Sequence, residues 1–145
     1  GLRHAATIRS IVAKRGAAPG TADQGTVLVV DDEEDLADTV EALLCAKGYR
    51  VFKVYDGKSA LRAALDLQPD LVLLDYELPE MDGLEVICRL REDEDLREVP
   101  VLLASAGRIS MEDIRQADGF LAKPFQEDLL YEMVERVLKA KRPAS

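Results

Sequence analysis

Thr26-Val-Leu-Val-Val-Asp-Asp32 is a run of apolar residues that ends in two acidic ones, and Leu71-Val-Leu-Leu-Asp75 has the same form with one acidic residue. Short continuous apolar runs are typical of strands that are buried on both faces of a parallel sheet. If these two strands lie side by side, the carboxylates of Asp31, Asp32 and Asp75 meet at one edge of the sheet. The sequence therefore predicts an acidic crevice at the carboxyl ends of the strands.

Such a crevice needs compensation for its charge. Two carboxylates about 4 Å apart repel each other by about 4 kcal/mol at an effective dielectric constant of about 20. Either one carboxylate stays protonated or a divalent cation lies among them, and the residues alone leave both alternatives open. Oxygen ligands at a site that handles phosphate favour Mg²⁺ over zinc.

The composition is that of one acidic globular domain. The chain has 145 residues, 48% of them hydrophobic and 32% charged, with a net charge of −9. Residues 1–25 carry +3 and the rest −12, which disfavours nucleic-acid binding by the folded body. No apolar stretch is long enough to span a membrane, and one histidine makes histidine-ligated metal sites improbable. Cys45 and Cys88 are expected to be small buried side chains in a reducing compartment, so a cytoplasmic location is expected.

The organisation along the chain is a tail followed by alternating strands and helices. Residues 1–25 are interpreted as a flexible tail or interdomain linker with a possible short basic helix at 2–14, residues 26–140 as the domain, and 141–145 as a disordered tail. Expected strands are 27–30, 51–54, 71–74, 101–104 and 120–122, and expected helices are 35–47, 58–67, 84–91 and 127–139. Leu65 is expected to face inward. Five such units predict an α/β fold, a single doubly wound five-stranded parallel sheet with helices on both faces.

In the flavodoxin-like strand order 2-1-3-4-5, ligands bind where the first and third strands diverge. The ends of the fourth and fifth strands bring Ser105 and Lys123 to the same rim. Carboxylates, a hydroxyl and an ammonium in one crevice suit a phosphoryl group carried on an aspartate.

Four motifs, in order and at compatible spacing, resemble the receiver domain of two-component response regulators. They are V-L-V-V-D-D-E at 27–33, L-V-L-L-D-Y-E-L-P-E-M-D-G at 71–83, V-L-L-A-S-A at 101–106 and G-F-L-A-K-P-F at 119–125. The resemblance extends from Val27 to about Leu138.

The resemblance implies a phosphorylation switch. Asp75 is then the phosphoacceptor, which receives its phosphoryl group from a phosphohistidine on a histidine kinase or histidine phosphotransfer protein. Lys123 is expected to contact the phosphoryl group and to pair with Asp75 at rest, and the Lys123–Pro124 bond to be cis. Ser105 is expected to be the switch hydroxyl and Phe120 the switch aromatic. Phe120 stands where many relatives have tyrosine, so it offers no hydroxyl to a partner.

The resemblance also implies a magnesium site. Asp32 and Asp75 are expected to bind Mg²⁺ directly together with the main-chain carbonyl of Glu77, and Asp31 to hold it through water. The domain is not expected to be an enzyme beyond its own phosphorylation and dephosphorylation. No nucleic acid or membrane is expected as its partner, and a weak dimer remains open, as does an origin as part of a hybrid histidine kinase.

One segment departs from the family pattern. The stretch between Ser105 and Lys123 is short by about one helical turn of ~4 residues. Gly107 and Ser110 also weaken the start of the helix expected there. We expect that helix to be short, displaced or mobile. In the family, this helix and the strands beside it form the surface that usually signals to output domains. The departure therefore concerns signal output and not the phosphorylation site.

Three other interpretations remain from the sequence. Asp31 and Asp32 could simply cap the following helix. The chain could be a pseudo-receiver, a protein interaction module that is never phosphorylated. It could also be a haloacid-dehalogenase-like phosphatase, but that class needs a second aspartate where this chain has Glu77.

Overall fold

The computed structural model describes residues 24–141. The helix expected at residues 2–14, most of the tail at 1–25 and residues 142–145 lie outside the described residues. None of the helices within 24–141 is long and apolar enough to cross a membrane.

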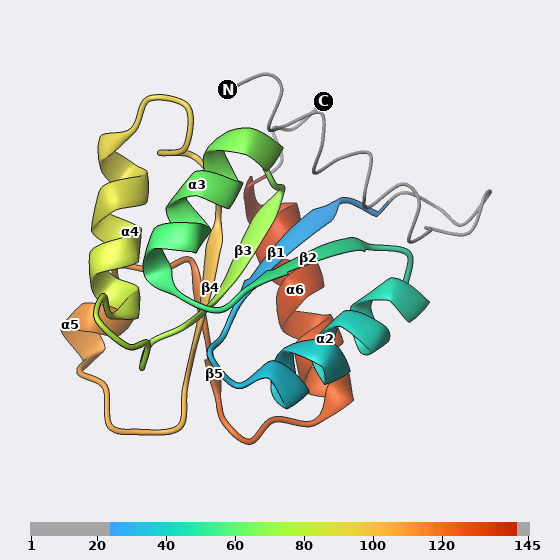
Figure 1. Cartoon of the computed structure of the whole chain (residues 1–145). Coiled ribbons are helices and arrows are strands. Elements are labelled where there is room, and N and C mark those ends of the chain that lie inside the picture. Colours follow the sequence, from blue (N-terminus) through green and yellow to red (C-terminus); the bar gives the residue numbers. More distant parts are fainter. Residues whose placement is uncertain (1–23, 142–145) are drawn as a thin grey trace.

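A five-stranded parallel sheet forms the centre of the domain, with the strand order β2-β1-β3-β4-β5 (Figure 1). This confirms the predicted fold class and order. The elements are β1 (Thr26–Val30), α2 (Glu34–Ala46), β2 (Arg50–Val54), α3 (Gly57–Leu67), β3 (Leu71–Asp75), α4 (Gly83–Glu92), β4 (Val101–Ser105), α5 (Met111–Ile114), β5 (Gly119–Ala122) and α6 (Glu127–Lys141).

Both faces of the sheet are buried, as the continuous apolar runs predict. Successive side chains of a strand point to opposite faces, so each inner strand contributes to two cores. Helices α3 and α4 cover one face, and α2 and α6 cover the other (Figure 1). The first core contains Leu28, Val30, Val72, Leu74, Val101 and Leu103, and the second contains Val27, Val29, Leu71, Leu73, Leu102 and Leu121.

Local capping explains where several helices start. The Asp56 carboxylate accepts a hydrogen bond from the Ser59 amide at 2.8 Å, and Asp82 accepts one from the Glu85 amide at 2.9 Å. Aspartate at these N-cap positions satisfies an amide that has no partner inside the helix. Helix α4 starts against the loop that follows Asp75, because the amide of its first residue, Gly83, donates to the Tyr76 carbonyl at 2.9 Å.

Three side chains expected in the core are exposed. Cys45 and Cys88 are both free and exposed, and Leu65 is 45% exposed. Each of them follows a residue on the buried stripe of its helix, for instance Leu44 before Cys45. One helical step is about 100°, which is enough to move a side chain from the core to the surface.

Helix α5 has only four residues and buries none of them. This confirms the prediction of a short helix between Ser105 and Lys123. The Ser110 side chain caps it by accepting a hydrogen bond from the Asp113 amide at 3.0 Å.

Candidate functional site

The predicted site residues gather where the strands end. Asp31 directly follows β1, Asp75 ends β3, Ser105 ends β4 and Lys123 follows β5. The register pairs Asp75 with Ala104 and Ser105 with Ala122, so neighbouring strands end at nearly the same level. The loops that leave these ends all lie on the lower side of the view in Figure 1.

Three carboxylates form the floor of the site. Asp31, Asp32 and Asp75 each offer an oxygen atom, and these atoms lie within 4.8 Å of one another. Asp31 is 6% exposed and Asp75 is 3% exposed, whereas Asp32 is exposed to solvent. Burial raises the pKa of Asp75 from 3.8 to about 7; the charge of Lys123 opposes this rise and that of Asp31 adds to it.

Lys123 is the cation of the site. Its Nζ lies 2.7 Å from Asp31 Oδ2 and 3.3 Å from Asp75 Oδ2, so it contacts both carboxylates and lies closer to Asp31. Burial lowers the pKa of Lys123, but the hydrogen bond to Asp31 and the charge of Asp75 outweigh it and raise the pKa above its ordinary value. The Lys123–Pro124 peptide bond is cis, as expected.

The helix-cap interpretation of the acidic pair is wrong, because the N-cap position of α2 belongs to Glu33. Asp31 Oδ1 accepts a hydrogen bond from the Glu33 amide at 2.9 Å, while its other oxygen contacts Lys123. The N-cap residue of α2 is Glu33, and its side chain makes no capping hydrogen bond. Local backbone contacts therefore orient Asp31, and its second oxygen remains directed into the site.

The donor set fits a magnesium ion. The three clustered ligand atoms are all carboxylate oxygens, as this hard cation prefers, and the Lys123 ammonium contacts two of the three carboxylates. The raised pKa of Asp75 is caused first by its burial, and the charge of Asp31 adds to the rise. A divalent cation among these oxygens would compensate the charge of the ionised carboxylates.

Ser105 ends β4, the strand next to the one that carries Asp75, and is 2% exposed. Its hydroxyl donates a hydrogen bond to Glu77 Oε2, and the Ala106 amide donates to Glu77 Oε1 at 3.3 Å. The Glu77 amide in turn donates to Asp75 Oδ1 at 3.1 Å. The sequence predicted that the Glu77 carboxylate lies near the metal site, but its contact with Ser105 was not predicted.

Phe120 is half-buried in β5 and packs against the core on the side of α3 and α4. Its register partner in β4 is Leu103, two residues before Ser105. It therefore lies beside the strand that carries Ser105, and its role as a switch stays a prediction.

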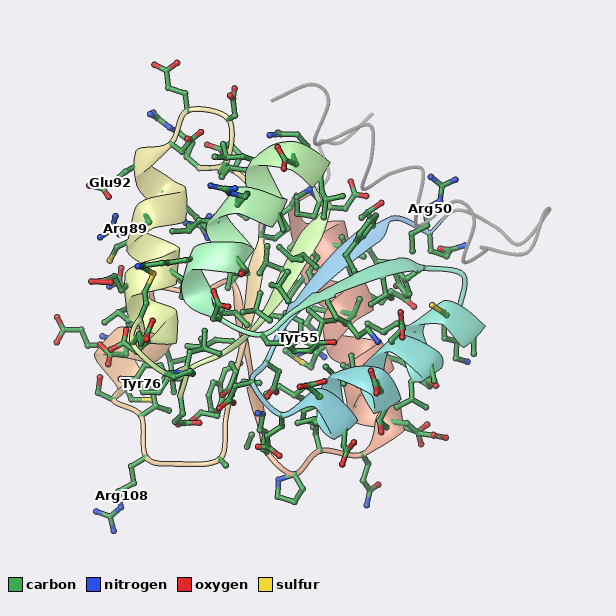
Figure 2. The ribbon with its side chains drawn as sticks, viewed as in Figure 1. Arg50, Tyr55, Tyr76, Arg89, Glu92 and Arg108 are labelled. Atoms are coloured by element: carbon green, nitrogen blue, oxygen red, sulfur yellow. The ribbon has the colours of Figure 1, made fainter. Side chains whose placement is uncertain are left out.

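Tyr76 is a further residue of the site that sequence reasoning missed. Its hydroxyl donates to Asp113 Oδ2 at 2.8 Å, so the residue after Asp75 is hydrogen-bonded to α5. Figure 2 shows Tyr76 on the side of the domain where α5 lies. This hydrogen bond raises the pKa of Tyr76. The Tyr76 amide donates to the Ala104 carbonyl at 2.8 Å, and its carbonyl accepts from the Gly83 amide at 2.9 Å. The only sequence signal was its position next to Asp75.

Comparisons with known proteins agree with this geometry. The family model of the response regulator receiver domain matches residues 27–135. The chain is 36% identical over 117 residues to the DNA-binding dual master transcriptional regulator RpaA of Synechocystis. This match covers 78% of this chain and 48% of RpaA. The chain is also 33% identical over 117 residues to the polar-differentiation response regulator DivK of Brucella ovis. This match covers 78% of this chain and 95% of DivK. The chain thus spans about half the length of RpaA and nearly all of DivK.

A solved structure is similar as well. The receiver domain of the sensor histidine kinase PA1611 from Pseudomonas aeruginosa has a TM-score of 0.74 and 33% identity, over 81% of this chain and 99% of that one. That structure has a magnesium ion coordinated in its active site cleft.

Proposed function

Because the chain belongs to the family of response regulator receiver domains, we propose that it is a phosphorylation-dependent signalling switch whose phosphoacceptor is Asp75. Receiver domains are signalling modules of two-component systems. The observation that carries the proposal is the position of Asp75, a buried carboxylate at a strand end with the Lys123 ammonium 3.3 Å away.

The proposed reaction transfers a phosphoryl group from nitrogen to oxygen. An Asp75 carboxylate oxygen attacks the phosphorus of a phosphohistidine and forms the new P–O bond. The P–N bond breaks, and its electron pair goes to the imidazole nitrogen of the donor. Lys123 compensates negative charge on the transferring group, and Ser105 donates a hydrogen bond to one of its oxygens in the product.

The acidic floor holds the cofactor in this proposal. The Asp32 and Asp75 carboxylates and the main-chain carbonyl of Glu77 would hold Mg²⁺ directly, and Asp31 would hold it through water. When bound, the ion stabilises the charge on the phosphoryl oxygens. The close set of oxygen atoms supports this assignment.

Phosphorylation would then change the conformation around β4 and β5. Ser105 moves toward the phosphoryl group, the loop after β4 follows, and Phe120 turns inward. A change from 1:99 to 99:1 in such an equilibrium requires about 5.5 kcal/mol of preference for the active state. A dianionic group bound by an ammonium, a hydroxyl and a divalent cation would supply this energy.

Receiver domains interact with histidine kinases or histidine phosphotransfer proteins, and we propose one of these as the phosphoryl donor. We expect no nucleic acid or membrane as a partner of this domain. A weak dimer, an origin in a hybrid kinase and the cytoplasmic location stay predictions.

The test is the intact mass of the full chain after incubation with acetyl phosphate and Mg²⁺. We expect one adduct of about 80 Da, the mass of one phosphoryl group. It should be lost in Asp75→Asn and on chelation of magnesium, and retained in Asp128→Asn, an exposed carboxylate at the start of α6. A folded wild-type chain that takes no adduct would instead support the pseudo-receiver alternative.

A further inference from the structure

The side chain of Glu77 joins two loops of the site. Glu77 belongs to the loop after β3, and its carboxylate accepts hydrogen bonds from the Ser105 hydroxyl and the Ala106 amide, which lie at the end of β4 and just beyond it. Its own amide donates to Asp75 Oδ1 at 3.1 Å, which ties the main chain of Glu77 to the phosphoacceptor. An anionic group thus already occupies two donors at the end of β4.

The neighbouring glycine leaves space for this carboxylate. A Cβ atom added to Gly107 would lie 3.2 Å from Glu77 Oε2. This is closer than ordinary van der Waals contact, so the carboxylate would have to move. The Gly107 amide also donates to Ser105 Oγ at 3.1 Å, which helps to orient the hydroxyl toward Glu77.

We propose that the Glu77 carboxylate competes with the phosphoryl group for Ser105, and this inference rests on the proposed function of Asp75. A serine hydroxyl has one proton to donate, so it cannot serve Glu77 and a phosphoryl oxygen at the same time. The other acceptor near the hydroxyl, the Gly107 carbonyl, is farther away at 3.4 Å. Ser105 can therefore bind the phosphoryl group only after Glu77 has released it.

Glu77 is in this account a positioning residue, which acts through Ser105. When the competent state is populated only in part, the apparent affinity for the ligand falls by that fraction. Removal of the Glu77 side chain frees Ser105 and should strengthen binding of a phosphoryl mimic. Because the net worth of one hydrogen bond is modest, we expect a change of about 2- to 10-fold.

Loss of the negative charge of Glu77 would also strengthen binding of the mimic, through weaker charge repulsion. Two variants distinguish this repulsion from competition for Ser105. Gly107→Ala keeps the charge and displaces the carboxylate, so competition predicts tighter binding and charge repulsion does not. In a Ser105→Ala background, competition predicts that loss of Glu77 has no further effect, whereas repulsion persists.

The experiment is calorimetric titration of the full chain with beryllium fluoride in magnesium buffer. Glu77→Ala should bind the mimic about 2- to 10-fold more tightly than wild type, and Gly107→Ala should shift in the same direction. Glu80→Ala is the matched control, because it removes an exposed carboxylate from the same loop and should bind as wild type does. Thermal melts of each variant verify that the chain remains folded.

Four results would count against the inference. Equal affinities in Glu77→Ala and Glu80→Ala, or an effect of Glu77 that persists without Ser105, would overturn it and leave the proposed function standing. A decrease in affinity in Gly107→Ala would do the same. If no variant binds the mimic and Asp75 takes no phosphoryl group, both the inference and the proposed function are wrong.

Discussion

Replacement of Asp75 by asparagine should stabilise the metal-free fold at neutral and alkaline pH. Asp75 is 3% exposed and shares its site with Asp31, while one ammonium serves both carboxylates. Asparagine has nearly the same shape and no charge. The variant therefore removes buried negative charge and keeps the ion pair between Lys123 and Asp31.

The size and sign of the effect follow from the pKa of Asp75, which rises from 3.8 to about 7 on folding. At about 1.4 kcal/mol per pH unit, the ionised carboxylate is about 4 kcal/mol less favourable in the folded than in the unfolded chain. We expect about half of this, about 2 kcal/mol, because the site is open to water at Asp32 and solvent screens its charges. Protonated Asp75 carries no penalty, so the contribution of Asp75 to the free energy of unfolding is highest below pH 3.8. It decreases as the pH rises from 3.8 through 7, where Asp75 loses its proton in the folded chain.

Urea unfolding of both proteins in a chelator, from about pH 4 to about pH 8, measures this difference. The free energy of unfolding of Asp75→Asn should rise relative to wild type across this range by about 2 kcal/mol. Asp95→Asn removes an exposed carboxylate from the loop before β4 and should give a flat difference. Magnesium should narrow the gap, because wild type gains more from binding it. A difference for Asp75→Asn that is flat or falls with pH would refute the reasoning.

Two further substitutions test contacts around the site, and a third tests a contact at the opposite end of the sheet. Gly83→Ala would place a Cβ 2.8 Å from the main chain of Asp75 and Tyr76, and urea unfolding should show a loss of about 1–3 kcal/mol. Tyr76→Phe removes the hydrogen bond to Asp113, and hydrogen exchange at α5 should become faster, whereas Tyr55→Phe should leave it unchanged. Arg91 donates through one nitrogen to the carbonyls of the loop before β4 and through the other to a carboxylate. Arg91→Lys cannot reproduce this fork, and thermal unfolding should show a loss of about 1–3 kcal/mol.

Sequence reasoning succeeded where one physical pattern fixes the structure. Continuous apolar runs such as Leu71–Leu74 require burial on both faces, and this predicted the parallel sheet and the edge at which Asp31, Asp75 and Lys123 meet. The prediction for Cys45 was wrong because an error of one residue in helical phase turns a side chain by about 100°.

The side-chain contacts of the loops could not be predicted in the same way. The bond between Glu77 and Ser105 joins residues 28 positions apart, and that between Tyr76 and Asp113 joins residues 37 apart. Each depends on the conformation of an irregular loop and on a rotamer, neither of which leaves a periodic signal. Sequence spacing therefore located the candidate phosphoacceptor and could not show what its two following residues contact.

These two contacts bear on how a signal would leave the site. The two residues after Asp75 both reach the segment between β4 and β5, Glu77 at its start and Tyr76 at α5. Helix α5 has four residues and buries none of them, so apolar packing contributes little to its position. Polar contacts from the loop after β3 must then contribute more to holding α5 in place than they would for a longer, buried helix. A change at Asp75 would therefore reach α5 through Tyr76 as well as through Ser105 and the loop after β4.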